Sequence, residues 1–185
     1  MNEEISYDGD HKAYIALGRF ISVFANMDYQ LTVHLSLMTN LGEKSANVLL
    51  QGMSMNVKLQ KLRQAAKFAD PVFGEYAPLY KKFSEYNEFR NKIVHWSHIF
   101  EEEGQCFDIT DPTRNAQKTL TAHRISVDPD DLIRIAEWIW NSLSFFYPFV
   151  SGHKEIIPEG YDVERLLREA PPVPKDRDTS LRTTV

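Results

Sequence analysis

The stretch EYAPLYKKFSEYNEFRNKIVHW, residues 75–96, has the period of one long amphipathic helix. Apolar side chains recur three and four residues apart along it, which places them on one helix face. That face contains Tyr76, Leu79, Tyr80, Phe83, Tyr86, Arg90, Ile93 and Ser97. We expect this helix to pack its aromatic face into a core, and Pro78 to be tolerated because it falls in the first turn.

Three further segments repeat the helical pattern. The first begins near Asp10, a suitable N-cap residue. The second spans about residues 43–69 and is interrupted near Gly52. The last has an N-cap at Asp128, with proline and two aspartates following it, and is expected to end at Pro148. Four amphipathic helices joined by short connections favour an up-and-down bundle.

The chain between the third and fourth long helices loses the helical period. Residues 97–127 contain short strand-like runs separated by turn residues, which indicates a small β-hairpin-like insertion. A short helix is expected over 162–170, and 171–185 has the proline-rich, charged composition of a disordered tail. The sequence therefore predicts a mainly all-α protein, with a helical domain over 1–160 and a short helix and tail over 161–185.

Composition restricts the class of protein. The 185 residues are 43% hydrophobic, enough for a core in one domain. The one cysteine, Cys106, allows neither an intramolecular disulfide nor a thiolate zinc cluster. No histidine pair has the spacing of a metal site, so no metal and no cofactor are expected. The first residues lack the pattern of a secretory signal and no apolar run reaches membrane length, so we expect a cytoplasmic protein without a membrane anchor.

The formal net charge of −5 bears on nucleic-acid binding. General nucleic-acid binders usually carry a basic surface, because much of their affinity comes from phosphate neutralisation. Any RNA site in this chain must therefore be local, or must form when two chains assemble.

Two sets of polar residues have ordinary structural explanations. His34 lies on or near the apolar face of the first helix and is expected to be a packed core histidine. Four cations in the second helical region do not share one helix face, and a solvated surface explains them: Lys58, Lys61, Arg63 and Lys67.

Two opposite charges interrupt apolar stripes. Arg90 lies between Tyr86 and Ile93 on the inward face of its helix, and Asp28 lies on the stripe of the first helix. A charge in such a place costs several kcal/mol unless it is paired. We expect Asp28 and Arg90 to form a pair, which by itself would need no function beyond holding the bundle together.

His95 adds a chemical group to the same helix. It follows Arg90 by five residues, which on a regular helix is about 140° round the axis and ~7.5 Å along it. Asn91 lies four residues before His95 and shares its face. A site using both Arg90 and His95 would form most easily where a second copy of the helix packs nearby, so we expect a homodimer.

These residues resemble a known family. The segment Arg90-Asn91-Lys92-Ile93-Val94-His95 is similar to the Arg-x-x-x-x-His motif of the HEPN superfamily, including the polar residue after the arginine. Residues 18–28 are similar to that family's apolar helix with one acidic position. The resemblance covers about residues 10–150. Asp28 stands where glutamate is commoner, and no tyrosine follows shortly after His95.

The resemblance implies a metal-independent endoribonuclease that leaves 2′,3′-cyclic phosphate ends on single-stranded RNA. His95 would be the general acid or base and Arg90 would bind the scissile phosphate. Asn91 would orient His95 or bind phosphate, and Asp28 would hold Arg90 in place. The implied role is in stress response, phage defence or as a toxin, with an antitoxin protein as a possible partner.

A second class of function remains open. The same residues could stabilise a non-catalytic module for dimerisation, interaction or nucleotide binding. The acidic net charge and the run Glu101-Glu102-Glu103 favour that alternative. The combination of Arg90, Asn91 and His95 favours the ribonuclease, because a merely structural helix does not need it.

Overall fold

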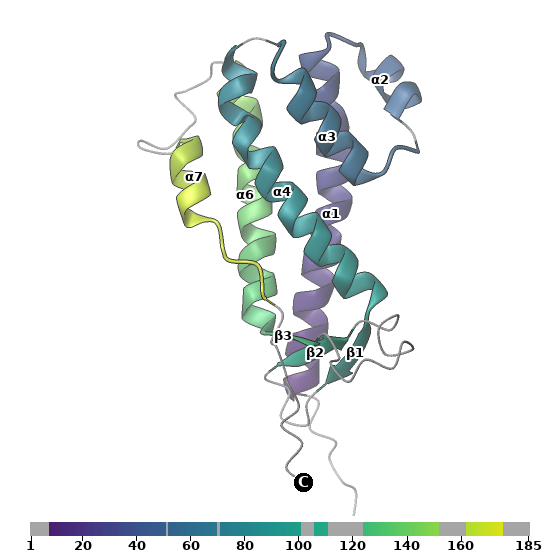
Figure 1. Cartoon of the computed structure of the whole chain (residues 1–185), viewed down its shortest axis with the longest axis vertical. Coiled ribbons are helices and arrows are strands. Elements are labelled where there is room, and N and C mark those ends of the chain that lie inside the picture. Colours follow the sequence, from purple (N-terminus) through teal and green to yellow (C-terminus); the bar gives the residue numbers. More distant parts are fainter. Residues whose placement is uncertain are drawn as a thin grey trace, which may run out of the picture.

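The computed structural model of the chain (Figure 1) describes residues 8–50, 52–69, 71–100, 106–110, 124–151 and 162–175. The helices are α1 (Asp8–Met38), α2 (Glu43–Leu50), α3 (Met55–Ala65), α4 (Pro71–His95), α6 (Pro129–Ser151) and α7 (Val163–Glu169). The strands are β1 (Ser97–Phe100), β2 (Phe107–Thr110) and β3 (Arg124–Val127).

Helices α1, α3, α4 and α6 form a bundle, because each buries one apolar stripe against its neighbours. The short α2 runs back along α1, so α3 runs in the same direction as α1 and the strict up-and-down alternation that we expected is not present (Figure 1). Helix α1 packs against α6 and α3, and α4 packs against α3 and α6. The short α2 covers one end of α1, and Gly52, with φ of 82°, makes the turn from α2 into α3. The predicted mainly helical fold with a small β insertion is confirmed.

Two prolines lie inside helices rather than at their ends. We had expected Pro78 in the first turn of its helix. Helix α4 begins earlier, at Pro71, so Pro78 lies beyond the first turn. Helix α6 continues to Ser151, so Pro148 does not end it. Proline at the first position of a helix is favourable because its missing N–H needs no partner there. The buried aromatic side chains of both helices supply packing that outweighs one lost backbone hydrogen bond at each internal proline.

The insertion forms an antiparallel sheet in the order β1-β2-β3. It lies at the end of the bundle where α4 ends and α6 begins (Figure 1). Its buried apolar residues are Phe107, Ile109, Ile125 and Val127, and Asp108 and Thr110 of β2 are buried with them. The expected insertion is thus a three-stranded sheet; part of it, including Glu101-Glu102-Glu103, lies outside the described residues.

A side-chain hydrogen bond attaches helix α7 to the bundle. Asp162 caps its first turn, and the Trp138 indole N–H donates to the carbonyl oxygen of Leu166 at 2.7 Å. Beyond α7, the Tyr86 hydroxyl donates to the carbonyl oxygen of Pro171 at 2.7 Å. The predicted short helix is therefore present, and the chain packs on α4 past residue 170, where we had expected a disordered tail to begin. Residues 176–185 lie outside the described part.

His34 is part of the aromatic core, as expected. Its ring stacks on Phe146 with 3.4 Å between centroids, and Tyr76 meets it edge-on. The Tyr80 hydroxyl is 3.3 Å from its Nδ1. Burial lowers the pKa of His34 to about 3, because the protonated ring would lose its hydration in the core. The imidazole is therefore neutral in the folded protein at any physiological pH.

The burial of His34 predicts a specific pH dependence of stability. Its folded pKa lies below the ordinary value of 6.5, so its stabilising contribution is complete above pH 6.5 and falls as the pH drops towards 3. Between pH 7.5 and 5.0 the wild type should lose about 2 kcal/mol of unfolding free energy through this group. His34→Phe should lack that component in urea unfolding at the two pH values. The matched control His11→Gln, at an exposed position of α1, should keep it; an equal loss in His34→Phe would contradict the assignment.

Candidate functional site

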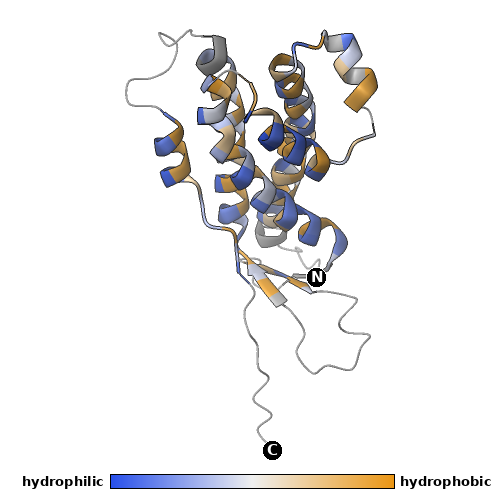
Figure 2. Cartoon of the chain, turned by 45° about the horizontal axis from the view of Figure 1, so that its top comes forward, coloured by the Kyte–Doolittle hydropathy of each residue, from blue (hydrophilic) through white to orange (hydrophobic). Residues whose placement is uncertain are grey.

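The predicted site residues lie in the last two turns of α4. The helix is continuous through His95, so Arg90, Asn91 and His95 keep the spacing expected of a regular helix. Arg90 and Asn91 are half-buried, while His95 is exposed. Figure 2 shows hydrophilic residues predominating on this part of α4, next to the sheet.

Arg90 uses few of its hydrogen-bond donors within the chain. Its guanidinium donates to Asn91 Oδ1 at 3.1 Å. Its Nε is buried without a partner, and no carboxylate among the described residues pairs with it. A guanidinium has five N–H donors in a rigid fork that fits carboxylate or phosphate. Arg90 therefore keeps most of its hydrogen-bonding capacity for an anion that the described residues do not supply.

Asp28 does not pair with Arg90, so that prediction is wrong. The Asp28 carboxylate accepts from Lys58 Nζ at 2.7 Å, which joins α1 to α3. Lys58 is buried, whereas we had expected it on the solvated surface. The physical reason is which helices are neighbours: α1 packs much more closely against α3 than against α4. Asp28 thus stabilises the packing of α1 against α3, and it does not hold Arg90 in place as we had expected.

Asn91 contacts the arginine rather than the histidine. Its side-chain oxygen accepts from Arg90, which fixes the orientation of both groups. His95 makes no hydrogen bond with any described residue and presents its ring to solvent. The chain therefore brings Arg90 and Asn91 together and leaves His95 about 140° round the helix from Arg90. One chain alone does not direct both groups to a single phosphate.

Other cations lie around this end of α4. Lys92 Nζ is 5.2 Å from the centre of the Trp96 ring, and the C-terminal end of the helix dipole also favours positive charge there. The local charge is therefore more positive than the net charge of −5 suggests.

No group of three or more histidine, cysteine, aspartate or glutamate side chains in the described part has the arrangement of a metal site. None of the described helices combines the length and apolar character of a membrane span.

The chain has no match among family models, curated proteins or solved structures. The resemblance to the HEPN superfamily therefore rests on the residues of α4 and on its helical setting.

The pairing of Asp28 predicts how mutations combine. Asp28→Ala should destabilise the fold by about 1–3 kcal/mol, because it leaves the buried Lys58 ammonium unpaired. Adding Lys58→Met should recover part of that loss, whereas adding Arg90→Met should be additive within about 0.5 kcal/mol. Urea unfolding of the single and double variants measures both couplings. A strong coupling of Asp28 to Arg90 with none to Lys58 would overturn the assignment.

Proposed function

We propose that this chain is a metal-independent endoribonuclease of the HEPN type, with Arg90, Asn91 and His95 as its site. The observation that carries the proposal is the state of Arg90: a half-buried guanidinium with a buried, unpartnered Nε, held by Asn91 and followed five residues later by an exposed histidine. A structural arginine would be expected to have a carboxylate partner. An anion-binding arginine beside a histidine that can exchange protons suits cleavage of a phosphodiester.

The reaction needs only groups of the RNA and of the protein. The 2′-hydroxyl oxygen attacks the adjacent phosphorus as His95 accepts its proton, or His95 donates a proton to the departing 5′-oxygen. The bond from phosphorus to the 5′-oxygen breaks, which leaves a 2′,3′-cyclic phosphate and a 5′-hydroxyl. Arg90 donates to the non-bridging oxygens, where negative charge accumulates in the pentavalent state. Asn91 holds Arg90 in position, and this is its role in the proposal.

A second copy of the chain would complete the site. Because Arg90 and His95 point apart on one helix, two α4 ends packed together would allow Arg90 of one copy and His95 of the other to reach one phosphate. Val94, next to His95, is an exposed apolar side chain at this end of the helix. We therefore propose a homodimer.

The resemblance to the HEPN superfamily implies a biological setting for this activity. A chain that cuts single-stranded cellular RNA would act in the cytoplasm, in stress response, phage defence or as a toxin controlled by an antitoxin protein.

A non-catalytic module for dimerisation or nucleotide binding is the second candidate. The observation in its favour is that Asp28 pairs with Lys58, so that no acidic group among the described residues positions Arg90. The two candidates differ in whether His95 matters for turnover.

The ribonuclease should cut single-stranded RNA with a chelator present and leave DNA intact, since only RNA has the 2′-hydroxyl. His95→Ala should slow cleavage by about 10²–10⁴-fold, the contribution of a general acid or base. Arg90→Lys, which keeps the charge but loses the fork, should slow it by about tenfold or more. Gel assays with mapping of cyclic phosphate ends measure these rates, and His11→Ala is the control. RNA left uncut by the wild type, or cut equally by His95→Ala, would favour the non-catalytic module.

The composite site predicts a dimer and complementation between variants. Light scattering should give about twice the 21.4 kDa of one chain. If Arg90 and His95 act from different copies, mixing Arg90→Lys with His95→Ala should restore about a quarter of wild-type activity, because half the dimers gain one intact site of two. A monomer with full activity, or a dimer without restoration, would place both groups in one chain.

A further inference from the structure

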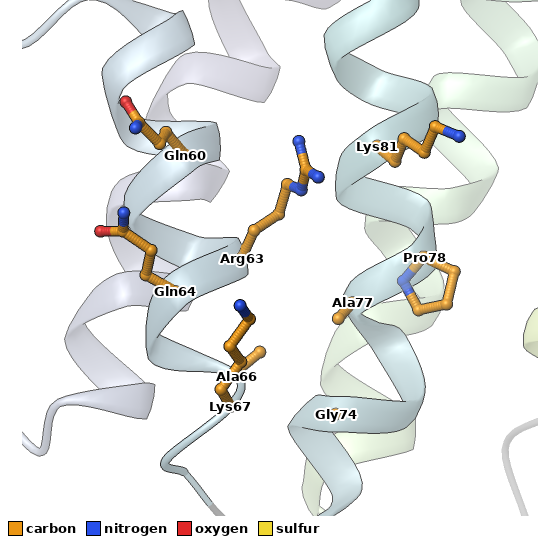
Figure 3. Close-up of a pocket in the computed structure, with 9 residues that line it drawn as sticks. All are labelled: Gln60, Arg63, Gln64, Ala66, Lys67, Gly74, Ala77, Pro78 and Lys81. Atoms are coloured by element: carbon orange, nitrogen blue, oxygen red, sulfur yellow. The ribbon is translucent and has the colours of Figure 1, made fainter.

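A groove between α3 and the first half of α4 is lined by cations. Its volume is 620 Å³, and Arg63, Lys67 and Lys81 line it together with Gln60 and Gln64 (Figure 3). The Arg63 guanidinium extends across the gap towards α4, and Lys67 lies on the same side of α3. The Lys81 side chain crosses α4 and its ammonium points away from α3 in this view, and a change of rotamer in its flexible stem would bring it over the groove.

The charge of this groove is not balanced locally. No acidic residue among the described ones lines it, and α3 with its following turn, residues 55–69, contains four cations and no carboxylate. Of these four, Lys58 is neutralised by Asp28, and Lys61 lies on another face of α3. The negative end of the α3 dipole stabilises Arg63 and Lys67, but Lys81 comes from the interior of α4 and gains nothing from it. The groove is thus a concentrated positive site on a chain of net charge −5.

The spacing of the groove residues suits a linear polyanion. Arg63 and Lys67 are four residues apart, one helical turn or about 6 Å. This is the order of separation of neighbouring phosphates along an extended strand. The two glutamine amides add uncharged donors and acceptors at the same rim, and the apolar floor includes Ala77 and Pro78.

An exposed aromatic residue follows the groove residue Lys67 in the chain. Phe68 directly follows Lys67 in the chain and is 90% exposed, more than any other large hydrophobic residue among those described. Such an aromatic ring costs solubility and contributes nothing to the core. Because it follows a groove cation directly in the chain, its ring is a surface on which a base of a bound single strand can stack.

We propose that the α3–α4 groove binds single-stranded nucleic acid, with Arg63, Lys67 and Lys81 on successive phosphates and Phe68 under a base. The contacts are to the backbone and to a base face, so the groove does not read sequence. It is separate from the Arg90–His95 site and does not depend on cleavage.

The salt dependence of binding tests the phosphate contacts. Binding of single-stranded oligonucleotides of mixed sequence would be measured by fluorescence anisotropy. The protein would carry His95→Ala, so that cleavage does not interfere with the measurement. Three contacts predict a slope of about −2 for log K against log salt, because each contributes about −0.7 on a single strand. Arg63→Gln with Lys67→Gln should weaken binding by about tenfold or more and reduce the slope to about −0.7. Lys61→Gln, on another face of α3, should change neither. An unchanged slope in the double variant would overturn the proposal.

A Phe68 variant tests base stacking, and competing ligands test whether the groove binds a strand or a single phosphate. Phe68→Ala should weaken strand binding by about tenfold without altering the slope, since stacking involves no counterions. Val48→Ala, at another exposed apolar position, is its control. Inorganic phosphate and a mononucleotide should compete only weakly, and affinity should rise with strand length. Displacement by millimolar phosphate with no dependence on strand length would show a lone-phosphate site and overturn the strand proposal.

Discussion

The aromatic face of α4 is the constraint on which the other features depend. Tyr76, Tyr80, Phe83 and Tyr86 are fully buried along it. Tyr76 and Tyr80 surround His34 of α1, while Phe83 and Tyr86 meet Trp138 of α6 edge-on. Rings of this size fit only one rotation of the helix in a close-packed interior. That rotation turns the opposite face of α4, from Lys81 to His95, towards solvent.

The outward face therefore carries Lys81 of the groove and His95, while Arg90 lies on the inward side of α4. Lys81 and His95 are fourteen residues apart, about 40° round the helix and ~21 Å along it. The groove and the histidine thus lie at different heights of the same face. Between them are Glu88, which is exposed, and Glu85, which Lys82 holds at 3.0 Å. Carboxylates at this place separate the two positive regions, so each must attract an anion through its own residues.

Buried charge in this bundle follows the neighbours of each helix. Asp28 and Arg90 both occupy apolar stripes, which led us to predict that they pair. The stripe shows only that a charge points inward; it does not show which helix it meets. Lys58 is long enough to bury its stem and carry its ammonium to Asp28, so it takes the aspartate. Arg90 is left with Asn91, and this is what makes it a candidate for binding an anion.

The sequence alone determined the helical period, the cap at Asp128, the burial of His34 and the motif from Arg90 to His95, because these depend on residues close together in the chain. Tertiary structure decided three things that depend on distant residues. It paired Asp28 with Lys58 and packed the α7 segment onto α4. It also brought Arg63 and Lys67 of α3 together with Lys81 of α4 in one groove. Helical periodicity assigns a side chain to a face, whereas partners across a bundle follow from which helices pack together and at what height.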